Sequence, residues 1–100
     1  MTTTVEAAFE AAVAPLLADP LVGRGRKRHC VDVAGKVFAM VSGGRLVVKL
    51  PRARVDELVE RGAGDRFRLG GRAMAEWVAL PVELAEPGPL VAEARRYVGG

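Results

Sequence analysis

Apolar positions at helical spacing mark the N-terminal part of the chain. They are Val5, Phe9, Ala12, Val13, Leu16 and Leu17, and together they form one stripe of an amphipathic helix. Thr3 and Glu6 have the spacing of a capping box, which predicts the helix start. Pro15 lacks a backbone N–H group, so we expect the helix to break or kink there.

A pattern of period two follows and predicts strands between residues 21 and 50. Residues 34–36 form a turn, residues 37–41 are an apolar β-prone run, and Gly43-Gly44 suits a tight hairpin. The next strand has two faces, one with Leu46, Val48 and Leu50 and the other with Arg45, Val47 and Lys49. Lys49 is therefore expected to point away from the core.

The second half of the chain repeats the alternation of helix and strand. Pro51 suits the first turn of a middle helix, which Gly62 ends. Residues 65–69 and 76–80 read as two strands, and residues 90–98 as a C-terminal helix. The order predicts an α+β fold, in which an antiparallel β-sheet meander carries the N-terminal, middle and C-terminal helices on one face. We expect residues 1–100 to form a single domain.

Composition indicates where such a chain works. Half of the residues are apolar, and Cys30 is the only cysteine, so no internal disulfide can form. A single cysteine fits a reducing cytoplasm. No apolar stretch approaches the roughly 18 residues needed to cross a bilayer, and the N-terminal segment lacks the basic region of a secretory signal. We predict a cytoplasmic protein without a membrane partner.

The net charge of +3 is unevenly distributed along the chain. Residues 1–23 carry −3, residues 24–72 carry +8, and residues 73–100 carry −2. The basic middle coincides with the predicted sheet, so positive charge can gather on one side of the fold. The alternative is compositional drift, since Arg makes up twelve of the fifteen bases.

The segment "RGRKRHC" is the densest run of bases. If it is extended, Arg24, Arg26 and Arg28 project from one face at spacings of about 7 Å, close to those of phosphates along one DNA strand. Arg45 and Lys49 extend that face across the sheet. The predicted nucleic-acid-binding residues are Arg24, Arg26, Lys27, Arg28, Lys36, Arg45 and Lys49, and a second patch consists of Arg66, Arg68 and Arg72.

Such a surface binds a polyanion without reading its sequence. The chain has no Asn and no Gln, the residues that pair bidentately with adenine. Trp77 and Tyr97 are expected in the core, which leaves few aromatic side chains for base stacking. DNA binding would therefore be non-specific and salt-sensitive. The alternative is a protein-interaction module or a small anionic-ligand-binding module, with no nucleic-acid role.

Side chains for catalysis are few. His29 is the only histidine and Ser42 the only serine. His29 and Cys30 are neighbours on a predicted strand and so point to opposite faces, which makes a nucleophile–base pair improbable. One histidine and one cysteine do not make a usual zinc site. We predict no enzymatic activity, no metal site and no cofactor.

Three blocks of the sequence together resemble the MmcQ/YjbR-like proteins and the related N-terminal domains of TfoX-type competence regulators. The blocks are "GKVFAMV" (35–41), "LVVKLP" (46–51) and "GGRAMAEWVAL" (70–80). The resemblance implies a small cytoplasmic bacterial domain with a frataxin-like twisted antiparallel sheet and a DNA-binding label. The matching positions are Lys36, Phe38, Lys49, Pro51 and Trp77. Of these, only the two lysines are expected to contact a ligand.

The chain departs from this family at Ala75, where a basic residue is frequent, so that part of a basic surface is weaker. Frataxin-like iron chemistry has no support either. The N-terminal helix carries only Glu6, Glu10 and Asp19 rather than an acidic ridge.

Overall fold

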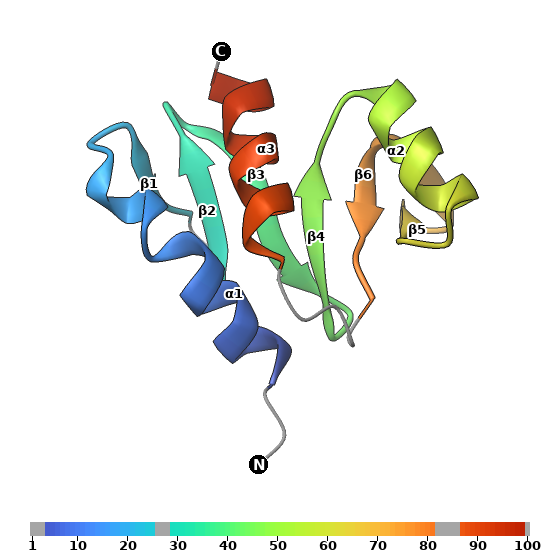
Figure 1. Ribbon diagram of the computed structural model, residues 1–100, viewed down its shortest axis with the longest axis horizontal. Coiled ribbons are helices and arrows are strands. Elements are labelled where there is room, and N and C mark those ends of the chain that lie inside the picture. Colours follow the sequence, from blue (N-terminus) through green and yellow to red (C-terminus); the bar gives the residue numbers. More distant parts are fainter. Residues whose placement is uncertain (1–3, 26–28, 82–86, 100) are drawn as a thin grey trace.

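Helices and strands follow one another much as the apolar pattern predicts. The computed structural model describes residues 4–25, 29–81 and 87–99, and these form three α-helices, a 3-10 helix and six strands (Figure 1). The helices are α1 (Val5–Val13), the 3-10 helix η1 (Leu16–Ala18), α2 (Arg52–Glu60) and α3 (Gly88–Gly99). The strands are β1 (Val22–Arg24), β2 (Cys30–Val33), β3 (Lys36–Ser42), β4 (Arg45–Lys49), β5 (Asp65–Leu69) and β6 (Arg72–Ala79).

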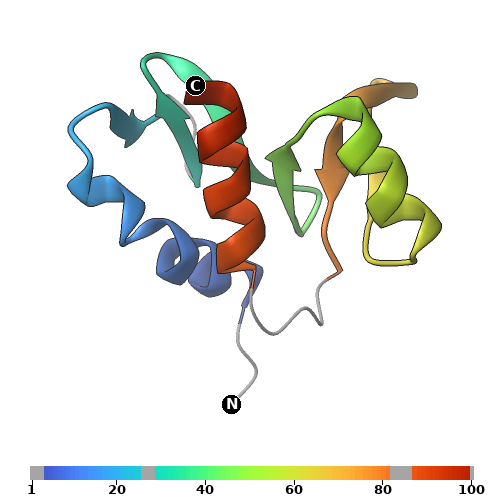
Figure 2. The ribbon, with the colours of Figure 1, turned by 45° about the horizontal axis from the view of Figure 1, so that its top comes forward.

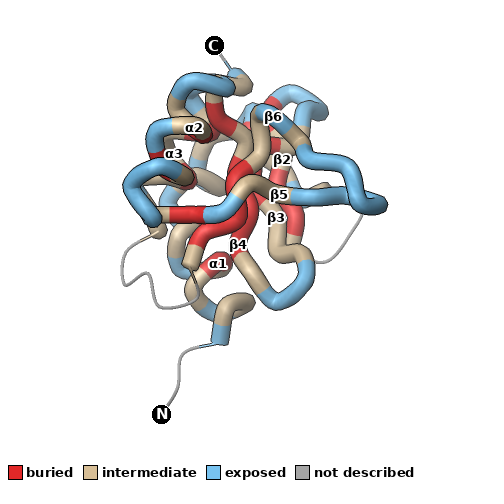
Figure 3. The backbone as a smooth tube through the Cα atoms, turned by 90° about the vertical axis from the view of Figure 1, so that its right-hand side faces the viewer, coloured by how far each residue is buried: buried red, intermediate tan, exposed pale blue. Residues whose placement is uncertain are grey.

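All six strands belong to one antiparallel sheet in the order β1-β2-β3-β4-β6-β5. The α-helices lie on one side of this sheet (Figure 3). Helix α3 crosses the centre, against β3 and β4, while α2 covers β6 and β5 (Figure 2). The predicted α+β class and the packing of the helices on one face are confirmed.

The last hairpin differs from a simple meander. Strand β6 lies beside β4, and β5 becomes the edge strand. The charged sequence of β5, with Asp65, Arg66 and Arg68, suits an edge, where charged side chains discourage pairing with other chains. Strand β6 also begins earlier than the predicted residues 76–80, because Gly70 and Gly71, with φ of 58° and 81°, make the turn alone.

The first helix begins at a cap one residue later than predicted. The Oγ1 atom of Thr4 accepts a hydrogen bond from the Ala7 N–H group at 3.0 Å, so Thr4 is the N-cap. The predicted cap, Thr3, lies outside the described residues. Helix α1 ends at Val13, and η1 follows Pro15. The predicted break at the proline is confirmed.

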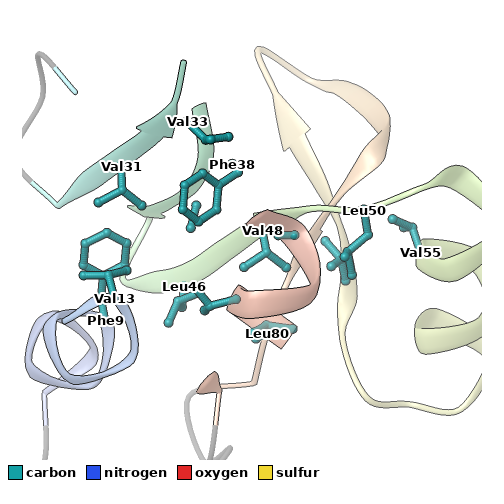
Figure 4. Packing of buried hydrophobic residues seen from close by; sticks show 14 of the residues in the cluster. Phe9, Val13, Val31, Val33, Phe38, Leu46, Val48, Leu50, Val55 and Leu80 are labelled. Carbon is teal, nitrogen blue, oxygen red and sulfur yellow. The ribbon is translucent and has the colours of Figure 1, made fainter. Parts of the chain in front are cut away.

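The core lies between the sheet and the helices. Figure 4 shows Leu46, Val48 and Leu50 of one strand face among side chains from the other elements. Each of these three side chains is less than 5% exposed, so the predicted inner face of β4 is confirmed. Val55 and Leu58 bring α2 into the same cluster.

A bulge in β3 changes which side chains face the helices. Val31 pairs with Ala39 and Asp32 pairs with Val37, which leaves Phe38 without an opposite residue. Phe38 and Ala39 are consecutive, yet both are fully buried in the core cluster. The strand therefore does not alternate strictly, and Val37 is available to the other face of the sheet.

Candidate functional site

The face of the sheet opposite the helices carries a row of mostly apolar side chains. Opposite residues in an antiparallel pair point to the same face, and the register joins Cys30, Met40, Val47 and Ala79 into one row across four strands. Lys49 pairs with Trp77 on the same face. We name this surface, from Cys30 to Trp77, the open face.

The open face contains a cavity of about 480 Å³, here named the open-face pocket. It is lined by Gly25, Cys30, Asp32, Gly35, Val37, Met40 and Trp77. Its volume is in the range of small-molecule sites, and its walls are largely apolar, as in most such sites. Of the described residues in this lining, Asp32 alone carries a carboxyl group.

Trp77 and Lys49 form a pair at the side of this pocket. The Lys49 ammonium lies 5.8 Å from the centroid of the Trp77 ring, within cation–π range. Lys49 is half-buried on the face away from the core, which confirms its predicted direction. Trp77 was expected in the core, but it is half-buried on the open face. Val47 is the next residue of β4 on the same face as Lys49. It is fully buried, although it lies on the side of the sheet away from the helices.

A second hollow of about 230 Å³ lies where α3 approaches the sheet, and we name it the lysine pocket. Its lining residues are Lys36, Lys49, Glu76, Tyr97 and Val98. The Tyr97 hydroxyl donates a hydrogen bond to Glu76 Oε1 at 2.7 Å, which raises the pKa of the phenol. Tyr97 is 40% exposed and is not the core residue that was expected.

Arg24 does not belong to the open face. Its backbone pairs with Val31, a core residue on the helix side. The guanidinium donates to both carboxylate oxygens of Glu10 in α1, at 2.6 and 3.0 Å. The prediction that Arg24 shares a face with Arg45 and Lys49 is therefore wrong, because strand register decides the face and sequence spacing does not.

Arg45 lies on the open face but is held by the protein itself. Its Nη1 donates to Asp65 at 2.8 Å, while Nε and Nη2 donate to the carbonyls of Leu80 and Ala79. These contacts join the start of β4 to the last hairpin. Arg45 thus acts mainly as a structural clamp, with little freedom to bind a ligand.

The remaining predicted cations divide into two groups. Arg26, Lys27 and Arg28 lie outside the described residues. Lys36 and Lys49 have no ion-pair partner in the described part of the chain, and both line the lysine pocket.

In the predicted second patch, Arg66 pairs with Asp56, and Arg68 donates to the carbonyl of Gly71 at 3.3 Å. Arg72 is exposed at the start of β6. The described bases thus do not converge on one surface.

His29 and Cys30 point in different directions, as their adjacency predicts. His29 Nδ1 lies 3.1 Å from Glu10 Oε2, and its ring stands edge-on to Phe9. Cys30 is buried and lines the open-face pocket. Among the described residues no three His, Cys, Asp or Glu side chains are grouped to hold a metal ion.

The contact between Glu10 and its two partners predicts a pH dependence. The Arg24 guanidinium, and next His29, lower the pKa of Glu10 from its usual 4.5. Its ionised form therefore stabilises the fold above pH 4.5, and this stabilisation is lost as the pH falls through the lowered pKa. Urea denaturation of Glu10→Gln and the native chain should give a stability difference that is present at pH 6 and shrinks towards pH 2.

Glu60→Gln is the matched control, because Glu60 is exposed on α2 and has no ion pair in the described part of the chain. Its stability difference should stay small at each pH. A Glu10→Gln difference that is constant between pH 6 and pH 2 contradicts the role assigned to the carboxylate.

The open-face pocket was not predicted from the sequence. Val37 and Met40 are three residues apart, so strict alternation assigns them to opposite faces. The bulge at Phe38 brings both onto the open face. One signal was present in the sequence, since Asp32 interrupts an apolar strand on the side away from Val31 and Val33.

No helix in residues 4–25, 29–81 and 87–99 has the length and apolar character needed to cross a bilayer. Comparisons with protein-family models, curated proteins and solved structures give no match. Membership of the MmcQ/YjbR-like family and a cytoplasmic location therefore stay predictions.

Proposed function

We propose that this chain is a non-enzymatic binding module for a small ligand that has an apolar body and an anionic group. The ligand occupies the open-face pocket. The observation that carries the proposal is the pair at its side, where the Lys49 ammonium lies 5.8 Å from the centroid of the Trp77 ring. A ligand against this pair meets an apolar wall and a positive charge together.

The apolar body of the ligand is recognised by the walls of the pocket. Val37, Met40 and Trp77 are each only half-buried in the empty protein. Contact with a ligand removes their remaining apolar surface from water, which is favourable by about 25 cal/mol per Å². The cavity of about 480 Å³ has room for a ligand with one aromatic ring.

The anionic group is recognised by Lys49. This ammonium has no ion-pair partner in the described part of the chain, in contrast to Arg24 and Arg45. Lys49 as a residue is half-buried, and a charge bound beside a partly buried group is screened less by water and salt. A charge-assisted hydrogen bond in such a position is worth about 1.5–3 kcal/mol.

Binding rather than catalysis fits the lining of the pocket. Cys30 and Asp32 are the reactive groups there, and His29 points to the helix side, towards Glu10. A cysteine nucleophile is usually activated by a histidine base, and the only histidine of the chain is turned away from this pocket. The proposal therefore assigns neither a chemical step nor a cofactor to this site.

A fluorescence titration tests the proposal, because Trp77 is the only tryptophan in the chain. The probes are 4-methylbenzoate and its neutral analogue 4-methylbenzamide. We expect the anion to change the emission of Trp77 and to bind about tenfold more tightly than the amide. Lys49→Met should remove this difference.

Lys36→Met is the matched control. Lys36 is also a lysine without an ion-pair partner in the described chain, and both lysines line the lysine pocket. Only Lys49, however, stands over Trp77, a lining residue of the open-face pocket. Lys36→Met should change the Kd of 4-methylbenzoate less than twofold. Equal binding of anion and amide by the native chain, or no response of Trp77 to either probe, refutes the proposal.

Non-specific DNA binding is the second candidate. It is favoured by the run of bases from Arg24 to Arg28 and by the exposed Lys36. It has less support than the small ligand, because Arg24 and Arg45 are held by carboxylates of the protein itself. A short DNA duplex separates the two. Salt-sensitive binding of the duplex that Lys49→Met leaves intact, without any binding of 4-methylbenzoate, favours DNA.

A further inference from the structure

We infer that the ligand of the open-face pocket is a zwitterion, with an ammonium group bound by Asp32 and an anionic group bound by Lys49 on either side of its apolar body. The inference rests on the proposed function and narrows it to one chemical class. It comes from the placement of Asp32, which the anionic-ligand proposal leaves unused.

Asp32 faces the open-face pocket without a partner in the described chain. It pairs in register with Gly23 on one side and Val37 on the other. Asp32 is half-buried as a residue, and neither a hydrogen bond nor an ion pair reaches its carboxylate from residues 4–25, 29–81 or 87–99. The carboxylate of a half-buried residue beside apolar walls is poorly solvated, so a cation from the ligand compensates for this cost.

The neighbour of Asp32 on β1 leaves space for a ligand. Gly23 has no side chain, and a Cβ atom added there would lie 3.6 Å from the Asp32 carboxylate oxygen Oδ1. Any larger side chain at this position would cover the carboxylate from the side of β1. With glycine, one side of the carboxylate stays open to a hydrogen-bond donor.

The distance between Asp32 and Lys49 selects among zwitterions. The two residues stand on β2 and β4, with β3 between them. Two strand spacings of about 4.8 Å separate their backbones by about 10 Å. Charge-assisted hydrogen bonds take about 2.8 Å at each end. The wide spacing of the two backbones favours a ligand with its charges at the two ends of a spacer over an α-amino acid, whose charges are only one carbon apart.

The wall between the two charges is apolar. Val37 and Met40 lie on β3, the strand between Asp32 and Lys49, and both line the pocket. An apolar spacer lies over them when the ligand extends from one charge to the other. A simple anion uses only the Lys49 end, and its charge is repelled by Asp32. The site therefore discriminates by charge at both ends of the ligand.

The test compares 4-(aminomethyl)benzoate with 4-methylbenzoate, which has the same ring and carboxylate but no ammonium group. With Trp77 emission as the readout, the zwitterion should bind the native chain about tenfold more tightly. Asp32→Asn should change the affinities for the two probes differently. The zwitterion should lose about tenfold, while 4-methylbenzoate should bind equally or more tightly, because a like charge has been removed.

Opposite effects on the two probes separate recognition from a structural role, since a distorted pocket would weaken both. Urea denaturation of Asp32→Asn checks the fold, and Glu60→Gln on α2 should leave both Kd values unchanged. Equal affinity of the native chain for the two probes overturns the zwitterion inference but leaves the proposed function standing. If neither probe binds, both proposals fail.

Discussion

Phe38→Ala should lower the free energy of unfolding by about 3–5 kcal/mol. The Phe38 ring is fully buried in the core cluster, and Figure 4 shows it beside Val33. Truncation removes an aromatic side chain from the core of a chain of only 100 residues and leaves a cavity that β3, paired on both sides, cannot close. Urea denaturation followed by circular dichroism measures the loss.

Phe67→Ala is the matched control for this experiment. Phe67 is the same residue type on the edge strand β5, and it is only half-buried. Its truncation should cost clearly less than that of Phe38. Two outcomes would contradict the burial of Phe38 by the bulge. One is an equal loss of unfolding free energy in both variants, and the other is a loss of less than about 1 kcal/mol in Phe38→Ala.

The strands and helices could be predicted because their signals are local. Alternation in β4 correctly separates Leu46 and Val48 from Lys49, since the side-chain period along a strand is two. Pro15 ends α1 because it has no N–H group to donate. Each of these signals acts within a few residues, so no knowledge of the tertiary fold is needed.

The partners of the basic side chains could not be predicted in this way. Arg24 binds Glu10, which is 14 residues away, and Arg45 binds Asp65, which is 20 residues away. These pairs exist only after α1 packs on the sheet and the last hairpin joins β4. Net charge along the sequence therefore overestimates the positive charge that is available to a ligand.

The open-face pocket depends on tertiary structure for a second reason. The bulge at Phe38 turns Val37 and Met40 to the same side, and β6 brings Trp77 next to Lys49 by inserting between β4 and β5. Neither the bulge nor the strand order is marked by a local sequence pattern. In the sequence, Val37, Met40 and Trp77 are therefore indistinguishable from ordinary strand residues. Only the register of the strands brings them together as a site.

Gly64→Ala should lower the free energy of unfolding by about 1–3 kcal/mol, because it overfills the contact between the end of α2 and β6. An added Cβ would lie 2.7 Å from Val78 Cγ2 and 3.2 Å from the Ala79 carbonyl oxygen. Val78 is fully buried in the core cluster, so it can withdraw only by displacing other core side chains. Gly88→Ala is the matched control, because nothing lies within 4 Å of its added Cβ.

The crowding at Val78 can be isolated by a double-mutant cycle. Val78→Ala removes the methyl group that the new Cβ meets, so Gly64→Ala should cost at least about 1 kcal/mol less in that background than in the native chain. Urea denaturation of the four proteins measures this coupling. If the losses of unfolding free energy are additive, the cost of Gly64→Ala arises elsewhere, at the Ala79 carbonyl or in the backbone. That result would contradict tight packing of the added Cβ against Val78.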